Sequence, residues 1–201
     1  MKVHLCLGVA LAIFLALPAA LEGARCGPRD DEVTAPWRPL SWDDYRAKLD
    51  SRRSSDAATT RVGLVLKNAE VTAAREGDGW VAKVERVCVY AAMYKLESGY
   101  THDNRTERNL AHGQLRFDLT EVFARRLYGR VLAMELEGPE PSALKARLKA
   151  EIEKAYTGMR KEWAAAMELH SQQTDYGRRR RGQKMWTRQV QEWLAELPPA
   201  P

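Results

Sequence analysis

Cysteine and histidine are scarce in this chain of 201 residues, which contains three cysteines and four histidines. Cys6 falls in an amino-terminal segment with the features of a secretory signal, so removal of that segment would leave only Cys26 and Cys88. The mature chain can therefore contain at most one internal disulfide. In an oxidising compartment Cys26 and Cys88 could form that bond, and the alternative is two unpaired thiols with Cys88 buried in a strand.

Long apolar stretches are absent after the first two dozen residues, which excludes a membrane-spanning helix in the remainder of the chain. The start combines the positive Lys2, an apolar run at 9–17 that is too short to cross a bilayer, and small residues at 19–24. These features predict a signal peptide over residues 1–24. We therefore expect a secreted or periplasmic protein whose mature chain of about 175 residues forms one domain.

Motifs of several other functional classes are also missing. The sequence has no internal repeats, no nucleophile elbow of a serine or cysteine hydrolase, and no recognisable nucleic-acid-binding module. Its formal net charge is +5, and positive charges alternate with negative ones along most of the chain. The exception is the arginine run at 178–181, which we interpret as a solvated loop or helix start. We expect no nucleic-acid partner.

Strand patterns come first in the sequence. Residues 25–39 include three prolines and predict an extended lead-in to a single domain at 40–197. Ser41 is the expected N-cap of a short helix at the start of that domain. The strands, predicted around a turn at 76–79, cover residues 61–67, 70–75 and 80–94. Because the last of these is apolar on both faces from Val87 onward, we expect it to be central in the sheet.

Helical periodicity dominates the second half of the chain. Long helices are predicted at 106–137 and 142–170, separated by two prolines, and a final helix ends before Pro198. The second long helix carries an apolar stripe at helical spacing, which predicts that it faces the core; the stripe consists of Leu144, Leu148, Ile152, Tyr156, Met159, Trp163, Met167 and His170. The predicted class is α+β, with a small amino-terminal antiparallel sheet packed on two long helices plus a carboxy-terminal helix.

His112 and Arg116 lie on one face of the first long helix, because residues four apart are neighbours on a helix. That face is mostly apolar, with Leu115, Leu119 and Phe123 in the same arc. An arginine in an apolar stripe must either extend past the helix edge into solvent or find a buried acceptor, since an unpaired buried charge is unfavourable. Both alternatives are open from the sequence.

The order and spacing of several short motifs resemble the bacterial predicted secreted zinc-dependent proteases. The similarity extends over almost the whole mature chain, and its motifs are Leu40-Ser41-Trp42-Asp43-Asp44-Tyr45, Leu110 to Glu121, Thr174-Asp175-Tyr176-Gly177 and Gln183-Lys184-Met185-Trp186. The resemblance implies a zincin-like scaffold. Members of this family typically have His-Glu-Gln-x-His-Phe-Asp where this chain has His112-Gly113-Gln114-Leu115-Arg116-Phe117-Asp118.

The zinc motif is degenerate in this chain. By this resemblance, His112 matches the first metal ligand, Arg116 replaces the second, Tyr176 replaces a third, and Gly113 occupies the position of the general base. Catalytic zinc takes three protein ligands and a water, and that water needs a nearby carboxylate to accept its proton. Arginine cannot ligate zinc because its guanidinium stays protonated, and glycine offers no base. We therefore predict no catalytic residue and no resident cofactor.

Two further hypotheses concern the altered site. The charge of Arg116 could replace that of the metal and hold Tyr176 or carboxylates, and we assign Arg116, Tyr176 and His170 as candidate binding residues. Alternatively, zinc could bind at a rebuilt site made by His102, His112 and His170.

The sequence thus favours a catalytically inactive member of the zinc-protease family that binds a peptide or protein partner. The alternatives are an active zinc metallopeptidase with displaced ligands, and a structural envelope protein that binds anionic partners. The sequence gives no basis for predicting the oligomeric state.

Overall fold

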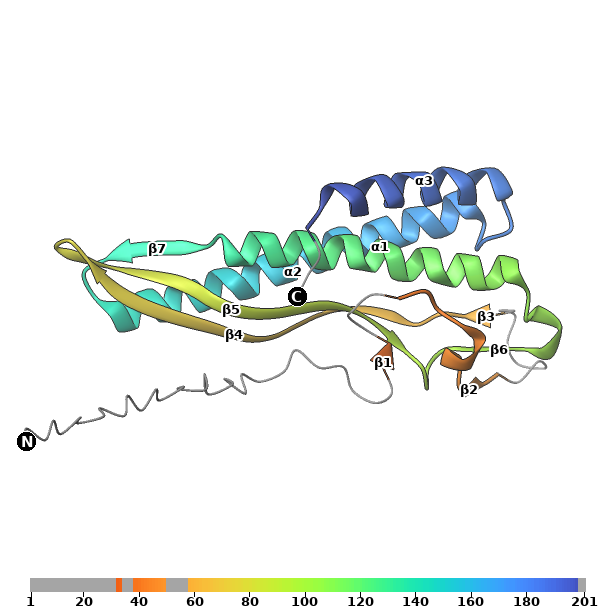
Figure 1. Cartoon of the computed structure of the whole chain (residues 1–201), viewed down its shortest axis with the longest axis horizontal. Helices are drawn as coiled ribbons and strands as arrows, with labels where there is room; N and C mark the ends of the chain where they lie inside the picture. The colour runs from red at the N-terminus through yellow and green to blue at the C-terminus, as the bar shows by residue number, and fades with distance from the viewer. Residues whose placement is uncertain (1–31, 34–37, 50–57, 199–201) are drawn as a thin grey trace, which may run out of the picture.

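The computed structural model describes residues 32–33, 38–49 and 58–198 (Figure 1). The predicted signal peptide at 1–24 and most of the predicted lead-in at 25–39 lie outside these residues. Cys88 is disulfide-bonded, which contradicts the alternative of an unpaired Cys88; Cys26, its candidate partner, lies outside the described part of the chain. None of the described helices is both long and apolar enough to cross a bilayer.

A long antiparallel hairpin forms the main sheet. Strand β4 (Val62–Glu76) and strand β5 (Gly79–Tyr94) pair along their whole length, and Gly77 adopts a positive φ of 60° in the turn between them. The sequence predicted two strands where the structure has the single strand β4. The predicted break coincides with a register shift between Lys67 and Glu70, where Asn68 has a φ of 51°. A bulge therefore interrupts the pairing without ending the strand.

The second half of β5 is central and buried on both faces, as predicted. Strand β1 (Glu32–Val33) and β4 pair with its two sides. Val89 and Met93 point into the main core, whereas Tyr90 belongs to a separate buried cluster on the opposite face. There the Tyr90 hydroxyl donates to the Glu32 carboxylate at 3.3 Å and accepts from the Lys67 ammonium at 2.5 Å. Both faces of β5 are thus covered, which accounts for its continuous apolar sequence.

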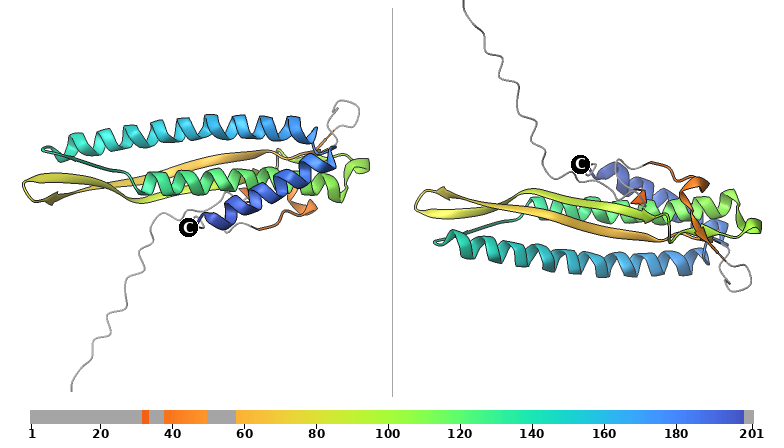
Figure 2. Two further views of the ribbon diagram at one scale, coloured as in Figure 1. Left: turned by 90° about the horizontal axis from the view of Figure 1, so that it is seen from above. Right: turned by 90° about the horizontal axis from the view of Figure 1, so that it is seen from below.

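Three α-helices follow in the described residues: α1 (Glu107–Leu132), α2 (Pro141–Thr174) and α3 (Arg180–Glu196). Helices α1 and α2 run beside the hairpin, and α3 lies toward the end far from the hairpin turn (Figures 1 and 2). All eight residues of the predicted α2 stripe are buried or half-buried. The mixed α and β composition is therefore confirmed, together with the core-facing side of α2.

The predicted end of the first long helix at residue 137 is wrong. Helix α1 ends at Leu132, and residues Glu135–Gly138 form strand β7, which pairs with Trp80–Lys83 of β5. This part of β5 has no partner on that side except β7 among the described strands, so the pairing satisfies backbone groups that would otherwise remain open on a sheet edge. For residues 135–138, pairing with β5 therefore outweighs the helical propensity of the sequence.

A second sheet, which the sequence did not predict, lies near the start of α1. It consists of β2 (Ala47–Lys48), β6 (Gly99–Tyr100) and β3 (Ala58–Thr59), and the β2–β6 pair is parallel. The expectation of one antiparallel sheet therefore needs correction, because the described residues form two sheets and one pair is parallel. Strands of two residues are too short to show a periodic pattern, so the sequence did not predict this second sheet.

We predict that Asn68→Val destabilises the protein, although Asn68 is exposed and loses no packing. A β-branched residue in the left-handed region should reduce the free energy of unfolding by about 1–2 kcal/mol. Thr72→Val, on an exposed position of the same strand, is the matched control and should not reduce stability. Urea denaturation would measure both, and equal stability of the two variants would contradict the proposed bulge geometry.

Candidate functional site

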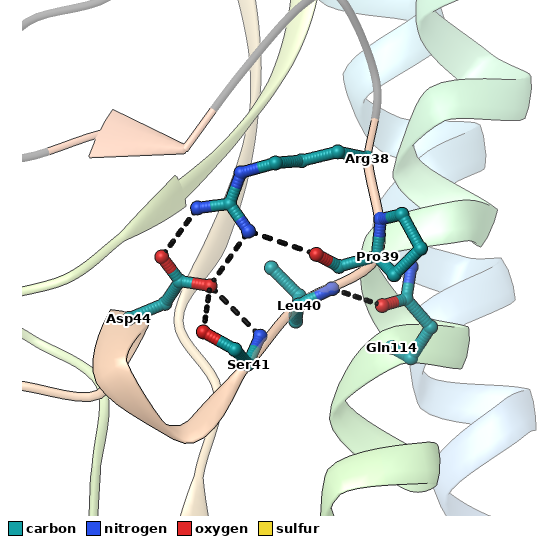
Figure 3. Close-up of polar contacts among 6 residues, drawn as sticks. All are labelled: Arg38, Pro39, Leu40, Ser41, Asp44 and Gln114. Atoms are coloured by element: carbon teal, nitrogen blue, oxygen red, sulfur yellow. Dashed lines mark hydrogen bonds and ion pairs between the residues drawn. The ribbon is translucent and has the colours of Figure 1, made fainter.

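Helix α1 is tied to the segment between β1 and β2 through Gln114 (Figure 3). The Gln114 side chain accepts a hydrogen bond from the Leu40 backbone amide at 2.5 Å and donates one to the Asp118 carboxylate at 2.6 Å. Ser41 is the N-cap of the short helix η1 (Trp42–Asp44), as predicted. Residues Gln114 and Asp118, which match the protease motif, therefore have a structural role in positioning α1.

Asp44 closes the same segment (Figure 3). Its carboxylate accepts two hydrogen bonds from the Arg38 guanidinium, at 2.5 and 2.9 Å, and one from the Ser41 backbone amide at 2.8 Å. Burial alone would raise the Asp44 pKa, but the hydrogen bonds from Arg38 and Ser41 outweigh it and lower the pKa. The segment is thereby held as a fixed turn against α1, which brings Tyr45 close to Gly113.

Gly113 is the point of closest approach between α1 and this segment. A Cβ atom at position 113 would overlap with the hydroxyl groups of Tyr45 and Thr60, which hydrogen-bond to each other at 2.9 Å. The position that corresponds to the general base is therefore filled by two neighbouring side chains. A glutamate could not be accommodated there unless Tyr45 or Thr60 moved.

His112 is positioned by Gln183 of α3. The Gln183 amide nitrogen donates to the Ala111 carbonyl at 3.2 Å, so its oxygen is available to accept from His112 Nδ1, also at 3.2 Å. This assigns the proton to Nδ1 and leaves Nε2 as an acceptor. Burial lowers the pKa of His112 from 6.5 to about 4, so the ring is neutral at neutral pH.

His170 lies beneath His112 and is fully buried. The two rings stack with centroids 4.9 Å apart, and Trp186 contacts His170 edge-on at 5.5 Å. Neither ring nitrogen of His170 has a hydrogen-bond partner among the described residues. Burial, with smaller contributions from His112 and Arg116, lowers the pKa of His170 to about 3.

Arg116 is largely enclosed one helical turn after His112. Its Nη1 donates to the Ser171 hydroxyl at 3.2 Å, and among the described residues it forms no ion pair with a carboxylate. Burial lowers the pKa of Arg116, and the nearby charge of Arg61 lowers it further. The described hydrogen-bond partner of Arg116 is thus Ser171 on α2, and not Tyr176.

Tyr176 lies in an unusual turn between α2 and α3. Asp175 and Tyr176 have positive φ values of 49° and 50°, and Gly177 follows with 85°. Backbone hydrogen bonds from Tyr176 to Ser171 and from Arg179 to Thr174 hold the turn. A side chain at Gly177 would overlap with the His112 ring. The turn therefore packs against His112 while the Tyr176 side chain is 65% exposed.

Two cavities meet at Arg116. The first, of about 630 Å³, lies between β4 and α2, and we name it the aromatic pocket after Tyr94, Tyr156 and Trp163. The second, of about 620 Å³, we name the arginine pocket; the described residues that line it are Ala58, Thr59, Thr60, Asn104, Arg108, Asn109, His112, Arg116, Tyr176 and Arg178. Arg116 lines both pockets and is therefore shared between them.

The available donor groups do not fit a catalytic zinc ion. Among the described residues, no group of three or more His, Cys, Asp or Glu side chains lies close enough together to hold a metal. The structure brings His112 and His170 together, but His102 is fully exposed beside Asp103 in the short helix η2 (His102–Asn104). Two histidines fall short of the three protein ligands that catalytic zinc takes.

Comparison with protein-family models, curated proteins and solved structures found no match to this chain. The relation to the zinc proteases therefore remains a prediction that rests on the motifs themselves.

Sequence reasoning missed several residues of the site. Arg108 has the same spacing to His112 as His112 has to Arg116, so the helical period could have placed it on the same face. Thr60, Ser171 and Gln183 reach the site from three other segments. No local pattern predicts such long-range contacts.

We predict that Gly113→Ala destabilises the protein by about 1–3 kcal/mol, because the methyl group overpacks against Tyr45 and Thr60. Gly129→Ala in the same helix is the matched control, since nothing lies within 4 Å of the added atom. It should increase stability by about 0.5–1 kcal/mol, the ordinary helix preference of alanine over glycine. If denaturant titration showed that both substitutions stabilise, the tight contact at Gly113 would be refuted.

We also predict that acid destabilises the protein through the histidine pair. Both folded-state pKa values lie below that of an unfolded histidine, so the unfolded chain binds more protons as pH falls below about 6.5. The stability contributed by the neutral rings is present above this pH and is lost toward pH 4. The melting temperature of His170→Leu should therefore fall less between pH 7 and pH 5 than that of the wild type. His102→Leu, at an exposed position, should behave like the wild type, and an equal drop in all three proteins would argue against the buried pair.

Proposed function

We propose that this chain is an exported, catalytically inactive relative of the secreted zinc-dependent proteases, and that its two adjoining pockets bind a peptide or protein partner. In this proposal the zincin-like scaffold is retained and its chemistry is lost. The observation that carries it is the position of Arg116, which lines both pockets and which, by the family resemblance, replaces the second metal ligand.

A fixed positive charge at this place opposes binding of a divalent cation. The guanidinium cannot donate an electron pair to a metal, and it is close enough to His112 and His170 to lower the pKa of both. The same charge disfavours a zinc ion more strongly than it disfavours a proton, because the ion carries two charges. Arg116 therefore favours a ligand that accepts hydrogen bonds.

The position of the general base supports the same conclusion. Tyr45 and Thr60 fill the space beside Gly113, and neither hydroxyl is a base at neutral pH. Burial raises the pKa of Tyr45 above its ordinary value, so the phenol stays protonated. Hydrolysis by a metal-bound water would thus lack two requirements: a third protein ligand for the metal and a proton acceptor for the water.

The pockets are well suited to binding. Each has a volume within the range of about 300–1,000 Å³ that is typical of ligand sites. The aromatic pocket offers Tyr156 and Trp163 for an apolar side chain beside the charged Arg61, Arg160 and Glu168, which also line it, and the arginine pocket offers hydrogen-bond donors. An extended peptide that crosses Arg116 could place adjacent residues in the two pockets.

One observation favours the enzyme alternative. His112 Nε2 has no assigned partner, and both nitrogens of His170 lack hydrogen bonds among the described residues. A peptidase with displaced ligands would use this pair together with a third donor from another source. The test below therefore measures metal binding and peptide binding on the same protein.

We predict that the purified mature protein, incubated with zinc and a random mixture of short peptides, retains peptides without cleaving them. Elemental analysis should find far less than one zinc per chain, with the same amount in His112→Ala. Mass spectrometry should recover intact peptides from the protein, equally with and without a chelator. Arg116→Met should retain about tenfold less peptide, the factor that corresponds to one charge-assisted hydrogen bond.

Arg130→Met is the matched control, because Arg130 is an exposed arginine of the same helix that lines neither pocket. It should retain peptides as well as the wild type does. Near-stoichiometric zinc that disappears in His112→Ala, together with chelator-sensitive cleavage, would replace the proposal with the peptidase alternative. A protein that retains no peptides would remove the binding function.

A further inference from the structure

Among the described residues that line the arginine pocket, the charged side chains are all positive. Three guanidinium groups line it, from Arg108, Arg116 and Arg178, and none of the described lining residues is an aspartate or glutamate. The remaining polar lining residues are Thr59, Thr60, Asn104, Asn109, His112 and Tyr176. His112 is neutral at neutral pH, so the arginines set the charge of the pocket.

These three arginines have few acceptors of their own. Arg108 has no hydrogen bond or ion pair among the described residues, and Arg178 has a long, largely exposed ion pair of 3.8 Å with Asp175. Arg116 uses one of its nitrogens for the Ser171 hydroxyl. A guanidinium has five N–H donors in a planar fork that matches a carboxylate. Most of the donors in this pocket are therefore available to a ligand.

The three groups come from two rigid parts of the fold. Arg108 and Arg116 lie on one face of α1, two helical turns apart, and His112 lies between them. Arg178 follows the strained turn at Tyr176, which is fixed against His112 by the close contact of Gly177. Because both parts are held by backbone packing, the three arginines are attached at fixed backbone positions, but the largely free side chains of Arg108 and Arg178 must still be ordered when a ligand binds.

We propose that the arginine pocket recognises a carboxylate of the bound peptide, and that a large apolar residue next to this carboxylate occupies the aromatic pocket. This inference rests on the proposed peptide-binding function and specifies its ligand. Arg116 is the shared element, because it lines both pockets and can hold the carboxylate at their junction.

Burial of Arg116 distinguishes this ligand from an anionic surface. A bilayer or a polyanionic envelope polymer would contact exposed arginines, such as Arg178, more readily than the half-buried Arg116 between α1 and α2. A single acidic group on a narrow chain can enter. The aromatic pocket adds a requirement for an apolar neighbour, which a peptide meets readily and a phosphate ion does not.

The test uses four labelled pentapeptides, each with one Phe in an otherwise Ala-based sequence. The residue beside Phe is Glu or Gln, and the carboxy terminus is free or amidated, so the set separates a side-chain carboxylate from a terminal one. Fluorescence anisotropy with the mature protein measures each dissociation constant. We expect at least one carboxylate-bearing peptide to bind about tenfold more tightly than the Gln amide, with an affinity that decreases as salt increases.

The arginines should account for this preference. Arg108→Ala removes an exposed side chain and should leave the fold intact, yet it should reduce the preference for the carboxylate at least threefold. Arg116→Met should abolish the preference. Arg130→Ala is the matched control on the same helix and should bind all four peptides as the wild type does. Urea denaturation of each variant verifies that it is folded.

The possible outcomes separate this inference from the function on which it rests. If all four peptides bind with equal affinity, or if Arg108→Ala and Arg116→Met keep the preference, peptide binding stands and carboxylate recognition is overturned. If no peptide binds, both proposals are overturned. If vesicles containing phosphatidylglycerol bind and displace the acidic peptides, and the Arg116→Met variant binds the vesicles equally well, the exposed arginines form an anionic surface contact and the pocket inference is wrong.

Discussion

The burial of β5 on both faces is the constraint on which the rest of this structure depends. From Val87 to Met93 the strand is buried on each side: the two long helices cover one face, and Tyr90 and its neighbours form a second buried cluster on the other. Helix α1 is consequently held close to the sheet end at which β3 and Thr60 lie. The contact at Gly113 is the closest point of that packing, and it places His112 and Arg116 between α1, α2 and the turn at Tyr176.

The parts of the fold that the sequence predicts are those whose periodicity reflects burial. The α2 stripe repeats at helical spacing because one side of a long helix faces the core, and the uninterrupted apolar run after Val87 reflects a central strand. The end of α1 was misplaced because residues Glu135–Gly138 pair with β5, a long-range contact that leaves no local signal. Asn68 appeared to end a strand, whereas its positive φ lets the strand continue through a bulge.

The site was predictable only where its residues share one helix. His112 and Arg116 are neighbours because they are four residues apart, and the same rule applies to Arg108. The proximity of His170, Ser171 and Gln183 depends on how α2 and α3 pack against α1, which no motif encodes. The role of Gln114 was also not predictable from the sequence. Its match to a protease motif suggests a place beside a catalytic site, whereas its hydrogen bonds attach the Leu40 segment to α1.

If the chain descends from a zinc protease, changes in several elements removed the metal site, and no single substitution would restore it. Glutamate at position 113 would meet Tyr45 and Thr60, which come from two other segments. Histidine at position 116 would add a ligand beside His112 and His170, but it would not supply the missing proton acceptor. A zinc ion and an arginine also differ in what they do to a bound carbonyl or carboxylate. The metal withdraws electrons and ionises water, whereas the guanidinium donates hydrogen bonds in a fixed plane and leaves the ligand unchanged. On the proposed function, the exchange of one cation for the other would convert a site that cleaves a peptide into one that holds it.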